Sequence, residues 1–253
     1  MTDRNEPAAG DCLLRPIAYI HTDFTDKFGL PRQSGLVPEL RGEIRFTEPY
    51  SQPDAVRGLS AFSHIWLLFG FHAAQRPHEK KGWSATVRPP RLGGNTRVGV
   101  FASRSPFRPN PIGLSCVKLE AVQTEQPVRL LVSGIDLLDG TPIYDIKPYI
   151  PVADCHPEAS EGYTAQTKLH RLDVRFPEAL LTLLPEDKQA AARALLAQDI
   201  RPGYADDPDR MYGIAFAGFE IRFTVSGDVL TVREVAPADP AERKEPDSDG
   251  KII

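Results

Sequence analysis

The sequence predicts a mainly β protein in which a barrel or a sandwich is followed by a small α+β unit. Three observations carry this prediction. Between residues 13 and 151, eight short apolar runs are separated by Gly, Pro, Asn and Asp. The 24 prolines of the 253-residue chain favour a body rich in strands and loops over a helical one. After residue 176, the apolar spacing changes from the period of a strand to that of a helix.

The eight runs of the first part are short and rich in β-branched or aromatic residues. They are LLRPIAYI, GEIRF, FSHIWLLFGFH, SATVRP, RVGVFA, LSCVKLEAV, VRLLVSGIDLL and PIYDIKPYI. Strands of this number and length are typical of barrels and sandwiches. FSHIWLLFGF is apolar at nearly every position, which predicts a strand buried on both faces. PDAVRGLSAF, residues 53–62, is the one short helical candidate here.

The last part of the chain predicts two helices and three strands. FPEALLTLLPEDKQAAARALLAQDI has helical spacing broken at Pro185, with PEDK as the start of a second helix. YGIAFAGFEIRFTVSGDVLTVREV indicates three strands with a Ser-Gly-Asp turn before the third. A unit this small is expected to dock on the first part or on a second subunit. The predicted division is a disordered tail at 1–12, a barrel domain at 13–165, a C-terminal domain at 166–235 and a disordered tail at 236–253.

Cysteine spacing and hydropathy exclude several classes of protein. Cys12, Cys116 and Cys155 are far apart and form no Cys-x-x-Cys pair, so neither a metal cluster nor a disulfide framework is expected. Cys116 follows an apolar strand pattern and is expected in the core. No apolar run reaches the roughly 18–20 residues that span a bilayer, and the N-terminus is polar and acidic. We therefore expect a soluble cytoplasmic protein without a membrane segment or a metal.

The distribution of charge is uneven. The chain has a formal charge of −4, yet residues 76–111 hold eight Lys or Arg and one acid. A basic segment on an acidic body can bind a polyanion, and a solvated surface is the alternative. The Gly-x-Gly-x-x-Gly and Walker A signatures, the His-Glu-x-x-His metal motif and the Gly-x-Ser-x-Gly elbow are all absent. Any nucleotide-like cofactor must therefore be held in another way.

VRPPRLGGNTRVGVFASRSPFRPNPIGLS, residues 87–115, is the most unusual stretch. Its prolines fix turns, and Gly93 and Gly94 permit close backbone approach. A stiff loop loses little entropy when it binds a ligand. The stretch therefore predicts arginines held for an anionic partner, although a well-built hairpin corner would explain the prolines equally well. These arginines are Arg91, Arg97, Arg104 and Arg108.

Three shorter motifs carry polar side chains on turns or strand ends. Arg32 in Pro-Arg-Gln, residues 31–33, offers a guanidinium to a carboxylate or phosphate. Asp136 and Asp145, near strand ends in SGIDLLDGTPIYDIKPYIP, are candidates to accept hydrogen bonds from a ribose or an amine. Arg201 and Tyr204 in AQDIRPGY suit an RNA phosphate and base, and an ordinary helix C-terminus is the alternative.

Taken in order, these motifs resemble the TsaA-like (TrmO, YaeB) family of S-adenosylmethionine-dependent tRNA methyltransferases. The similarity covers about residues 14–235 and is carried by PRQ, AFSHIWLLFGFH, TVRPPRLGGNTRVGVFASRSPFRPNPIGLS, DLLDGTPIYDIKPYIP and QDIRPGY. The family usually has Asp-Pro-Arg-Pro-Ala where this chain has Asp-Ile-Arg-Pro-Gly at 199–203. The aspartate and arginine are kept, but this turn is expected to be looser.

The resemblance implies a small β-barrel rather than a Rossmann fold, and a homodimer with sites near the subunit interface. It implies a tRNA (adenine(37)-N6)-methyltransferase acting on threonylcarbamoyl-adenosine beside the anticodon. The product would be N6-methyl-N6-threonylcarbamoyladenosine. The alternative is a non-catalytic barrel that binds RNA or an adenosyl compound.

The resemblance also assigns residues. The implied contacts of S-adenosylmethionine are Pro31, Arg32, Gln33, His72, Ala73, Arg104, Leu114, Ser133, Gly134, Ile135 and Asp136. Asp136 and Asp145 are the candidate catalytic carboxylates. The residues expected to contact the tRNA anticodon loop are Arg91, Arg97, Arg108, Lys147, Arg201 and Tyr204.

Overall fold

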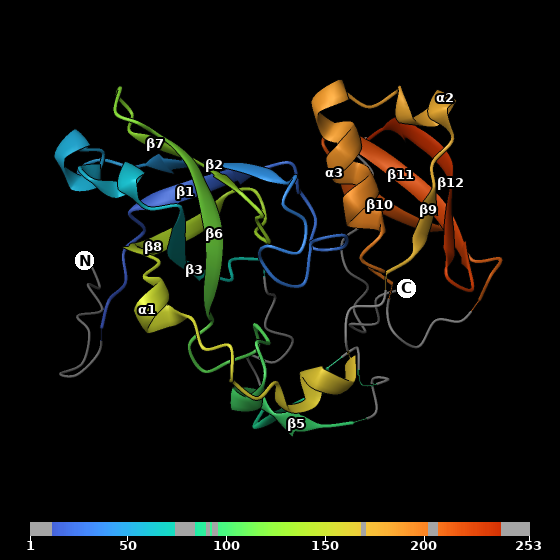
Figure 1. Ribbon diagram of the computed structural model, residues 1–253, viewed down its shortest axis with the longest axis horizontal. Coiled ribbons are helices and arrows are strands. Elements are labelled where there is room, and N and C mark those ends of the chain that lie inside the picture. Colours follow the sequence, from blue (N-terminus) through green and yellow to red (C-terminus); the bar gives the residue numbers. More distant parts are fainter. Residues whose placement is uncertain are drawn as a thin grey trace, which may run out of the picture.

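Six of the predicted strand runs close into an antiparallel barrel in the computed structural model, in the order β1-β2-β7-β6-β3-β8 (Figure 1). The structure describes residues 12–73, 84–89, 92, 96–167, 171–201 and 207–238. The barrel strands are β1 (Ala18–Thr22), β2 (Arg41–Phe46), β3 (His64–Gly70), β6 (Ile112–Gln123), β7 (Arg129–Ser133) and β8 (Thr141–Pro148). A mainly β barrel is thereby confirmed, and the sandwich alternative is excluded.

Alternation along each strand fills the barrel, because successive side chains of a strand point to opposite faces. On β3, Ile65 and Leu67 are fully buried, whereas Trp66 and Leu68 on the outer face are half-buried. The prediction that this strand is buried on both faces is therefore wrong for its outer face. Cys116 on β6 lies opposite Trp66 and is likewise half-buried rather than in the core.

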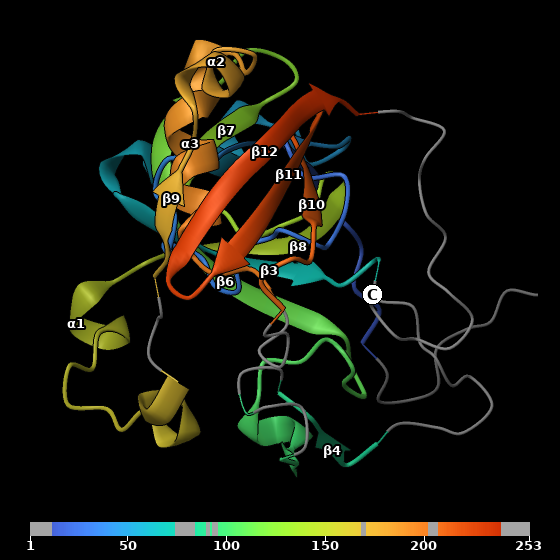
Figure 2. The same ribbon diagram turned by 90° about the vertical axis from the view of Figure 1, so that its right-hand side faces the viewer.

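Two of the eight predicted runs do not join the barrel. β4 (Thr86–Val87) and β5 (Val98–Gly99) pair with each other in a separate two-stranded ribbon, which lies below the barrel in both views (Figures 1 and 2). The 3-10 helix Val100–Ala102 follows it. The predicted helix at 53–62 is instead two 3-10 turns, Pro53–Val56 and Leu59–Ala61, separated by Gly58 at a φ of 85°. A left-handed residue cannot continue a right-handed helix, so the turns stay separate.

Three long connections leave the same end of the barrel. Strand pairing places the end of β1 beside the start of β2, the end of β7 beside Arg41, and the end of β3 beside Ile112. Thr141, the first residue of β8, pairs with Ile20 near the end of β1. The connections 23–40 and 134–140, and the described residues at the two ends of the β3–β6 connection, therefore lie at one rim.

The C-terminal unit is a four-stranded sheet with helices on one side. Its order is β10 (Tyr212–Phe216), β11 (Phe219–Ser226), β12 (Val229–Pro237) and β9 (Asp173–Arg175), with only β9 parallel to its neighbour. The helices α2 (Glu178–Leu181) and α3 (Glu186–Leu196) are separated at Pro185. The three predicted strands and the helix break are confirmed. Strand β12 continues through Ala236 and Pro237, so the predicted tail starts two residues too early.

Two short helices, α1 (Pro151–Asp154) and the 3-10 helix Gly162–Thr167, connect the two sheets. The predicted domain boundary between residues 165 and 166 falls within the second of them. Cys12 is exposed, and the other residues of the predicted N-terminal tail lie outside the described part of the chain. The same holds for residues 239–253 of the predicted C-terminal tail.

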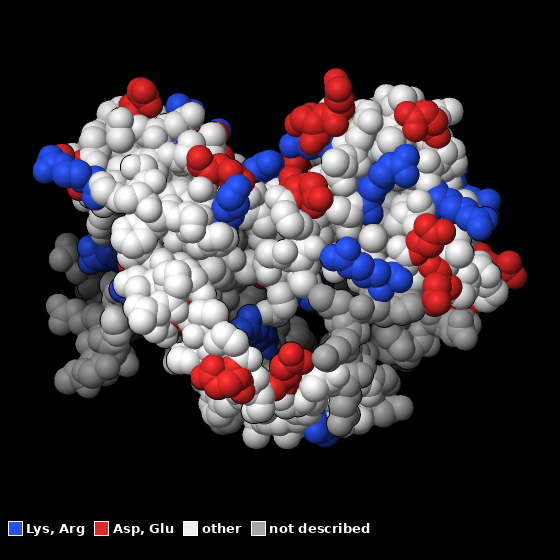
Figure 3. Space-filling view, viewed as in Figure 1, with Lys and Arg blue, Asp and Glu red and all other residues white. Residues whose placement is uncertain are grey.

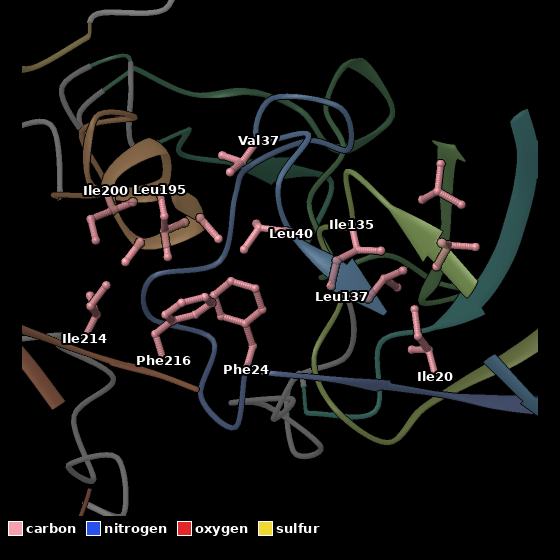
Figure 4. Packing of buried hydrophobic residues seen from close by; sticks show 14 of the residues in the cluster. Ile20, Phe24, Val37, Leu40, Ile135, Leu137, Leu195, Ile200, Ile214 and Phe216 are labelled. Carbon is pink, nitrogen blue, oxygen red and sulfur yellow. The ribbon is translucent and has the colours of Figure 1, made fainter. Parts of the chain in front are cut away.

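One hydrophobic core runs from the barrel into the C-terminal unit. Figure 4 shows Phe24 and Phe216 side by side, with barrel residues on one side of them and Leu195, Ile200 and Ile214 on the other. The two rings are 5.4 Å apart and both residues are fully buried, an arrangement that adds to the stabilisation from burial itself. The expectation that the small C-terminal unit needs a docking partner is met by the barrel.

Candidate functional site

The Pro-Arg-Gln segment, residues 31–33, lies midway along the β1–β2 connection. Pro31 is buried, and the Gln33 side-chain amide donates to the Arg32 carbonyl oxygen over 2.5 Å. Arg104, from the β3–β6 connection, donates from its guanidinium to the side-chain oxygen of Gln33. Two motifs that are distant in sequence are thus joined directly at the barrel rim.

The segment after β7, which begins at Gly134, is hydrogen-bonded to the β1–β2 connection at two points. The Gly134 carbonyl oxygen accepts from the Gly35 amide at 2.8 Å, and the Gly134 amide donates to the Leu40 carbonyl at 2.9 Å. Gly134 has a φ of 69°, and a Cβ there would come within 3.3 Å of the Gly35 Cα. Glycine is therefore required both for the backbone conformation and for the close approach of the two loops.

The side chains on either side of Gly134 already have structural partners. The Ser133 hydroxyl is buried and donates to Glu120 at 2.6 Å. Together with Lys118 and Arg41, this hydrogen bond lowers the Glu120 pKa to about 2. Ile135 is buried in the barrel core. Any contact of Ser133 or Ile135 with a ligand would therefore be made by the backbone.

Asp136 is a carboxyl group of the site whose pKa is raised. Burial raises its pKa to about 6, against the opposing effects of the Ser115 hydroxyl, the amides of Ser34 and Asp136 itself, and the positive charge of Arg104. Its Oδ1 atom is buried and has no hydrogen-bond partner in the described part of the chain. A buried carboxylate oxygen without a partner is costly, so it marks a position where a ligand donor fits.

Asp145 lies in a different environment from Asp136. It is on β8, opposite Leu68 of β3, with 44% of its side chain exposed. Its carboxylate forms an ion pair with Lys147 at 2.8 Å. The two candidate catalytic carboxylates are therefore separated, with Asp136 beside Arg104 and Asp145 on the outer wall of the barrel.

Three other predicted cofactor residues lie around the same rim. His72 follows β3, and its Nδ1 is 3.4 Å from the Thr141 hydroxyl oxygen at the start of β8. Its neighbour Ala73 is exposed. Leu114 is on the outer face of β6 and is 52% exposed.

The arginines of the rigid loop have different partners. Arg108 donates to the carbonyl oxygens of Ser103 at 2.7 Å and Val100 at 3.3 Å, and its guanidinium lies 5.8 Å above the Phe101 ring. It therefore braces the loop from within. Arg97 is exposed and donates to the Thr86 hydroxyl at 2.9 Å. Arg91, Gly93 and Gly94 lie outside the described residues.

In the C-terminal motif AQDIRPGY, the charged side chains pair with each other. Arg201 makes two hydrogen bonds to Asp199, at 2.8 and 3.0 Å, and its carbonyl oxygen accepts from Arg32 at 3.1 Å. Tyr204 lies outside the described residues. Figure 3 shows basic and acidic side chains interspersed on the face seen there, without one large patch of either sign.

Sequence reasoning missed the polar residues that surround Asp136. Ser115 closes the arginine-proline motif and is buried on β6, where its neighbours on the inner face are apolar. A polar residue at an inward position of a strand requires a partner, and this signal could have identified it. Ser34 carries no comparable sequence signal.

The described residues contain no group of three His, Cys, Asp or Glu side chains arranged to hold a metal ion. Within the same ranges, no helix has the length and apolar character needed to cross a membrane.

Comparison with known proteins gives two family matches that together span most of the chain. The N-terminal domain of tRNA-methyltransferase O matches residues 19–155, and the TrmO C-terminal domain matches residues 169–238. The tRNA (adenine(37)-N6)-methyltransferase of Escherichia coli is 45% identical over 230 residues, which are 87% of this chain and 96% of that protein. A probable S-adenosyl-L-methionine-binding protein of Pyrococcus abyssi is 33% identical over 160 residues, covering 63% and 79% of the two chains.

Solved structures agree with these sequence matches. A crystal structure of TrmO from P. aeruginosa superposes with a TM-score of 0.74 at 35% identity, covering 92% of this chain and all of that one. The architecture of barrel and C-terminal sheet therefore resembles that of a solved TrmO structure over most of the chain. The chain belongs to the tRNA-methyltransferase O family.

Proposed function

We propose that this protein methylates N6 of adenine 37 in tRNA with S-adenosylmethionine, and that the adenine carries a threonylcarbamoyl group. The reaction follows from family membership and from relatives named for it. The observation that carries the site is the hydrogen bond from Arg104 to Gln33 at the rim of the barrel, near enough to Asp136 for the Arg104 charge to lower the Asp136 pKa. There a guanidinium lies beside a buried carboxyl group that has an oxygen without a partner.

The chemistry of these residues fits S-adenosylmethionine, which supplies an activated methyl group when bound. Arg104 offers a planar donor to a carboxylate, either that of the cofactor or that of the threonyl group. The unpartnered Asp136 oxygen offers an acceptor to an amine or a hydroxyl. The hydrogen bond between Gly35 and Gly134 brings the two loops together, and other main-chain groups of these loops are proposed as further contacts. The same proposal assigns contacts to Pro31, Arg32, Gln33, His72, Ala73, Leu114, Ser133 and Ile135.

Positioning supplies most of the rate enhancement in such a transfer, and alignment of the reacting atoms can contribute about 7–11 kcal/mol. The N6 nitrogen of a urea-like linkage is a weak nucleophile with one proton to lose. A carboxylate near the nitrogen can accept that proton. We assign this role to Asp136 rather than Asp145, because a pKa of about 6 leaves Asp136 mostly ionised at neutral pH, whereas Asp145 is paired with Lys147 away from Arg104.

The tRNA partner is proposed to be its anticodon loop. Exposed Arg97 supports this assignment, and Lys147 is 63% exposed although it is paired with Asp145. Arg91 and Tyr204 belong to the same proposal but lie outside the described residues. RNA binding by Arg108 and Arg201 stays a prediction from the sequence. In the structure, both guanidinium groups donate hydrogen bonds to other groups of the chain.

A homodimer in the cytoplasm is part of the proposal. Several apolar side chains are exposed at the start of β6 and in the loop before it, which supports a covered surface in an assembly. They are Phe101, Phe107, Ile112 and Leu114. Light scattering would measure the mass in solution, and a monomer would contradict this part of the proposal. The cytoplasm is assigned because tRNA is the substrate. The division between a barrel domain and a C-terminal domain at residues 165 and 166 is likewise proposed, with the second domain ending after β12.

The test uses methyl-labelled S-adenosylmethionine and two tRNA preparations, one from cells that make the threonylcarbamoyl group and one from cells that do not. We expect label only in the first. Label in both preparations would contradict the threonylcarbamoyl requirement. Cofactor binding without transfer to either would support the non-catalytic module instead.

A further inference from the structure

The Asp199–Arg201 pair closes a tight bend directly after α3. The guanidinium of Arg201 binds both carboxylate oxygens of Asp199, and the two side chains are only 13% and 19% exposed. Asp199 has a φ of 45°, in the left-handed region that few residues other than Gly, Asn and Asp adopt readily. A bidentate pair of low exposure holds the bend in one conformation.

This bend presents a backbone carbonyl to the cofactor loop. The Arg201 carbonyl oxygen accepts from Arg32, and the Arg32 carbonyl accepts from Gln33. The side-chain oxygen of Gln33 accepts from Arg104, whose charge acts on Asp136. A series of hydrogen bonds therefore runs from the C-terminal unit to Arg104, whose positive charge lowers the pKa of the proposed catalytic carboxylate.

The rest of the β1–β2 connection is also packed against the C-terminal unit. The Ala217 amide donates to the Asp23 carbonyl at 3.1 Å, and Lys188 pairs with the Asp23 carboxylate at 2.6 Å. A Cβ at Gly29 would come within 3.1 Å of Ile214. Together with the Phe24–Phe216 contact (Figure 4), these interactions fix residues 23–29 of the loop, and the Arg201 carbonyl contacts its Pro-Arg-Gln centre.

We propose that Asp199 and Arg201 are positioning residues for the cofactor: the ion pair sets the Arg201 carbonyl, which holds Arg32 and Gln33 in the conformation that binds S-adenosylmethionine. This inference rests on the cofactor assignment of the proposed function. Its consequence is that the Asp-x-Arg motif acts on cofactor affinity even without RNA. A phosphate contact by the Arg201 side chain would instead have to share the guanidinium that already binds Asp199.

The proposed gain in cofactor affinity comes from pre-organisation of the Pro-Arg-Gln loop. A loop already held in its bound conformation loses less conformational entropy when the ligand binds. Replacing one partner of a poorly exposed ion pair leaves the other charge without compensation, so the bend is expected to relax. The Arg201 carbonyl then moves relative to Arg32, and cofactor affinity falls although neither side chain contacts the cofactor.

The experiment compares Asp199→Asn and Arg201→Lys with wild type. Asparagine tolerates a left-handed φ, and lysine keeps the charge but not the fork, so both variants are conservative. Arg233→Lys is the matched control, since Arg233 is exposed on β12 and donates to Thr224 at 3.1 Å. Calorimetry measures the Kd of S-adenosylmethionine without tRNA, filter binding measures the Kd of tRNA, and thermal melting checks folding.

We expect the cofactor Kd to rise about tenfold in both variants, as for one lost charged hydrogen bond, and to stay at the wild-type value in the control. The tRNA Kd should change by less than about twofold, because no phosphate contact is lost. In steady state, the KM for the cofactor should rise more than kcat falls. Hydrogen exchange at residues 32–35 should accelerate in folded Asp199→Asn, a readout that does not depend on activity.

An unchanged cofactor Kd would overturn the inference. If that result came with weaker tRNA binding and a smaller salt dependence, Arg201 would be an RNA contact as the sequence suggested. A wild-type protein that bound no S-adenosylmethionine would overturn the cofactor assignment itself, and with it this inference. Because the wild-type result is measured separately, the two failures are distinguishable.

Discussion

The Arg104 guanidinium donates to the side-chain oxygen of Gln33, a residue 71 positions earlier in the chain. This contact joins the β1–β2 and β3–β6 connections at one rim of the barrel and places a positive charge beside Asp136. The arginine-proline segment therefore contacts the Pro-Arg-Gln loop, and we propose that the two segments form opposite walls of the cofactor site.

Replacement of Arg104 by lysine should separate charge from geometry. Lysine keeps the positive charge but cannot make a planar, two-pronged contact with a carboxylate. We expect Arg104→Lys to raise the Kd of S-adenosylmethionine, or to weaken discrimination against unmodified adenosine, by about tenfold. Calorimetry and single-turnover methylation of the two tRNA preparations would measure these effects. Arg97→Lys, at an exposed position of the same loop region, is the control.

Unchanged cofactor affinity together with unchanged discrimination in Arg104→Lys would contradict the assignment of a carboxylate partner to this residue. Loss of both in the Arg97→Lys control would show that the effect is not specific to the Arg104 guanidinium.

Asp136 should govern the pH dependence of methyl transfer. With its pKa near 6, the carboxylate is ionised above that pH, so the single-turnover rate should rise through about pH 6 and then level off. Asp136→Asn should lower the rate and flatten this profile. Asp145→Asn, which removes only the exposed partner of Lys147, should leave both unchanged. Equal rates in wild type and in both variants would exclude either carboxylate as the base.

The sign of the change in unfolding free energy of Asp136→Asn can also be predicted. The folded-state pKa of Asp136 is above that of the unfolded chain, so the folded state binds the proton more tightly and wild type loses stability as the pH rises from about 4 to 6. Asparagine cannot ionise. Relative to wild type, Asp136→Asn should therefore gain up to about 3 kcal/mol between those limits. Urea unfolding at a series of pH values would measure the gain.

Ser115→Ala provides a matched control for this effect. The Ser115 hydroxyl lowers the Asp136 pKa, so its removal should raise that pKa further and extend the loss of stability to higher pH. Identical unfolding profiles for wild type, Asp136→Asn and Ser115→Ala would contradict the environment described for Asp136.

Arg108→Ala should destabilise the arginine-proline loop. The variant loses hydrogen bonds to two backbone carbonyls and the contact with the Phe101 ring, a change of about 1–2 kcal/mol. Arg97→Ala loses one exposed hydrogen bond and should cost less than about 0.5 kcal/mol. Tm and tRNA affinity should be measured on both variants. We expect Arg108→Ala to lower Tm more than Arg97→Ala does, and Arg97→Ala to weaken tRNA binding more than Arg108→Ala does. An Arg108→Ala protein of wild-type stability with weak tRNA binding would favour the RNA contact suggested by the sequence.

Local signals in the sequence were sufficient for most secondary structure. Proline at 185 separates two helices, and the Ser-Gly-Asp turn separates the last two strands, because turn chemistry acts within a few residues. The same signals could not assign the 86–87 and 98–99 runs to a separate ribbon, since strand partners are chosen across the whole chain. Cys116 shows the same limit, because an apolar pattern does not state which face of a strand is covered.

The sequence by itself determined the β-rich fold class, the rigidity of the arginine-proline segment and, through its ordered motifs, the family. Only the tertiary structure separated Asp136 from Asp145, because burial and partner choice depend on residues far away in the chain. It also gave Arg108 and Arg201 partners within the protein, and it brought Arg32 to a carbonyl 169 residues away. Such contacts arise where loops from different strands meet at one rim, and no local pattern of residues encodes that meeting.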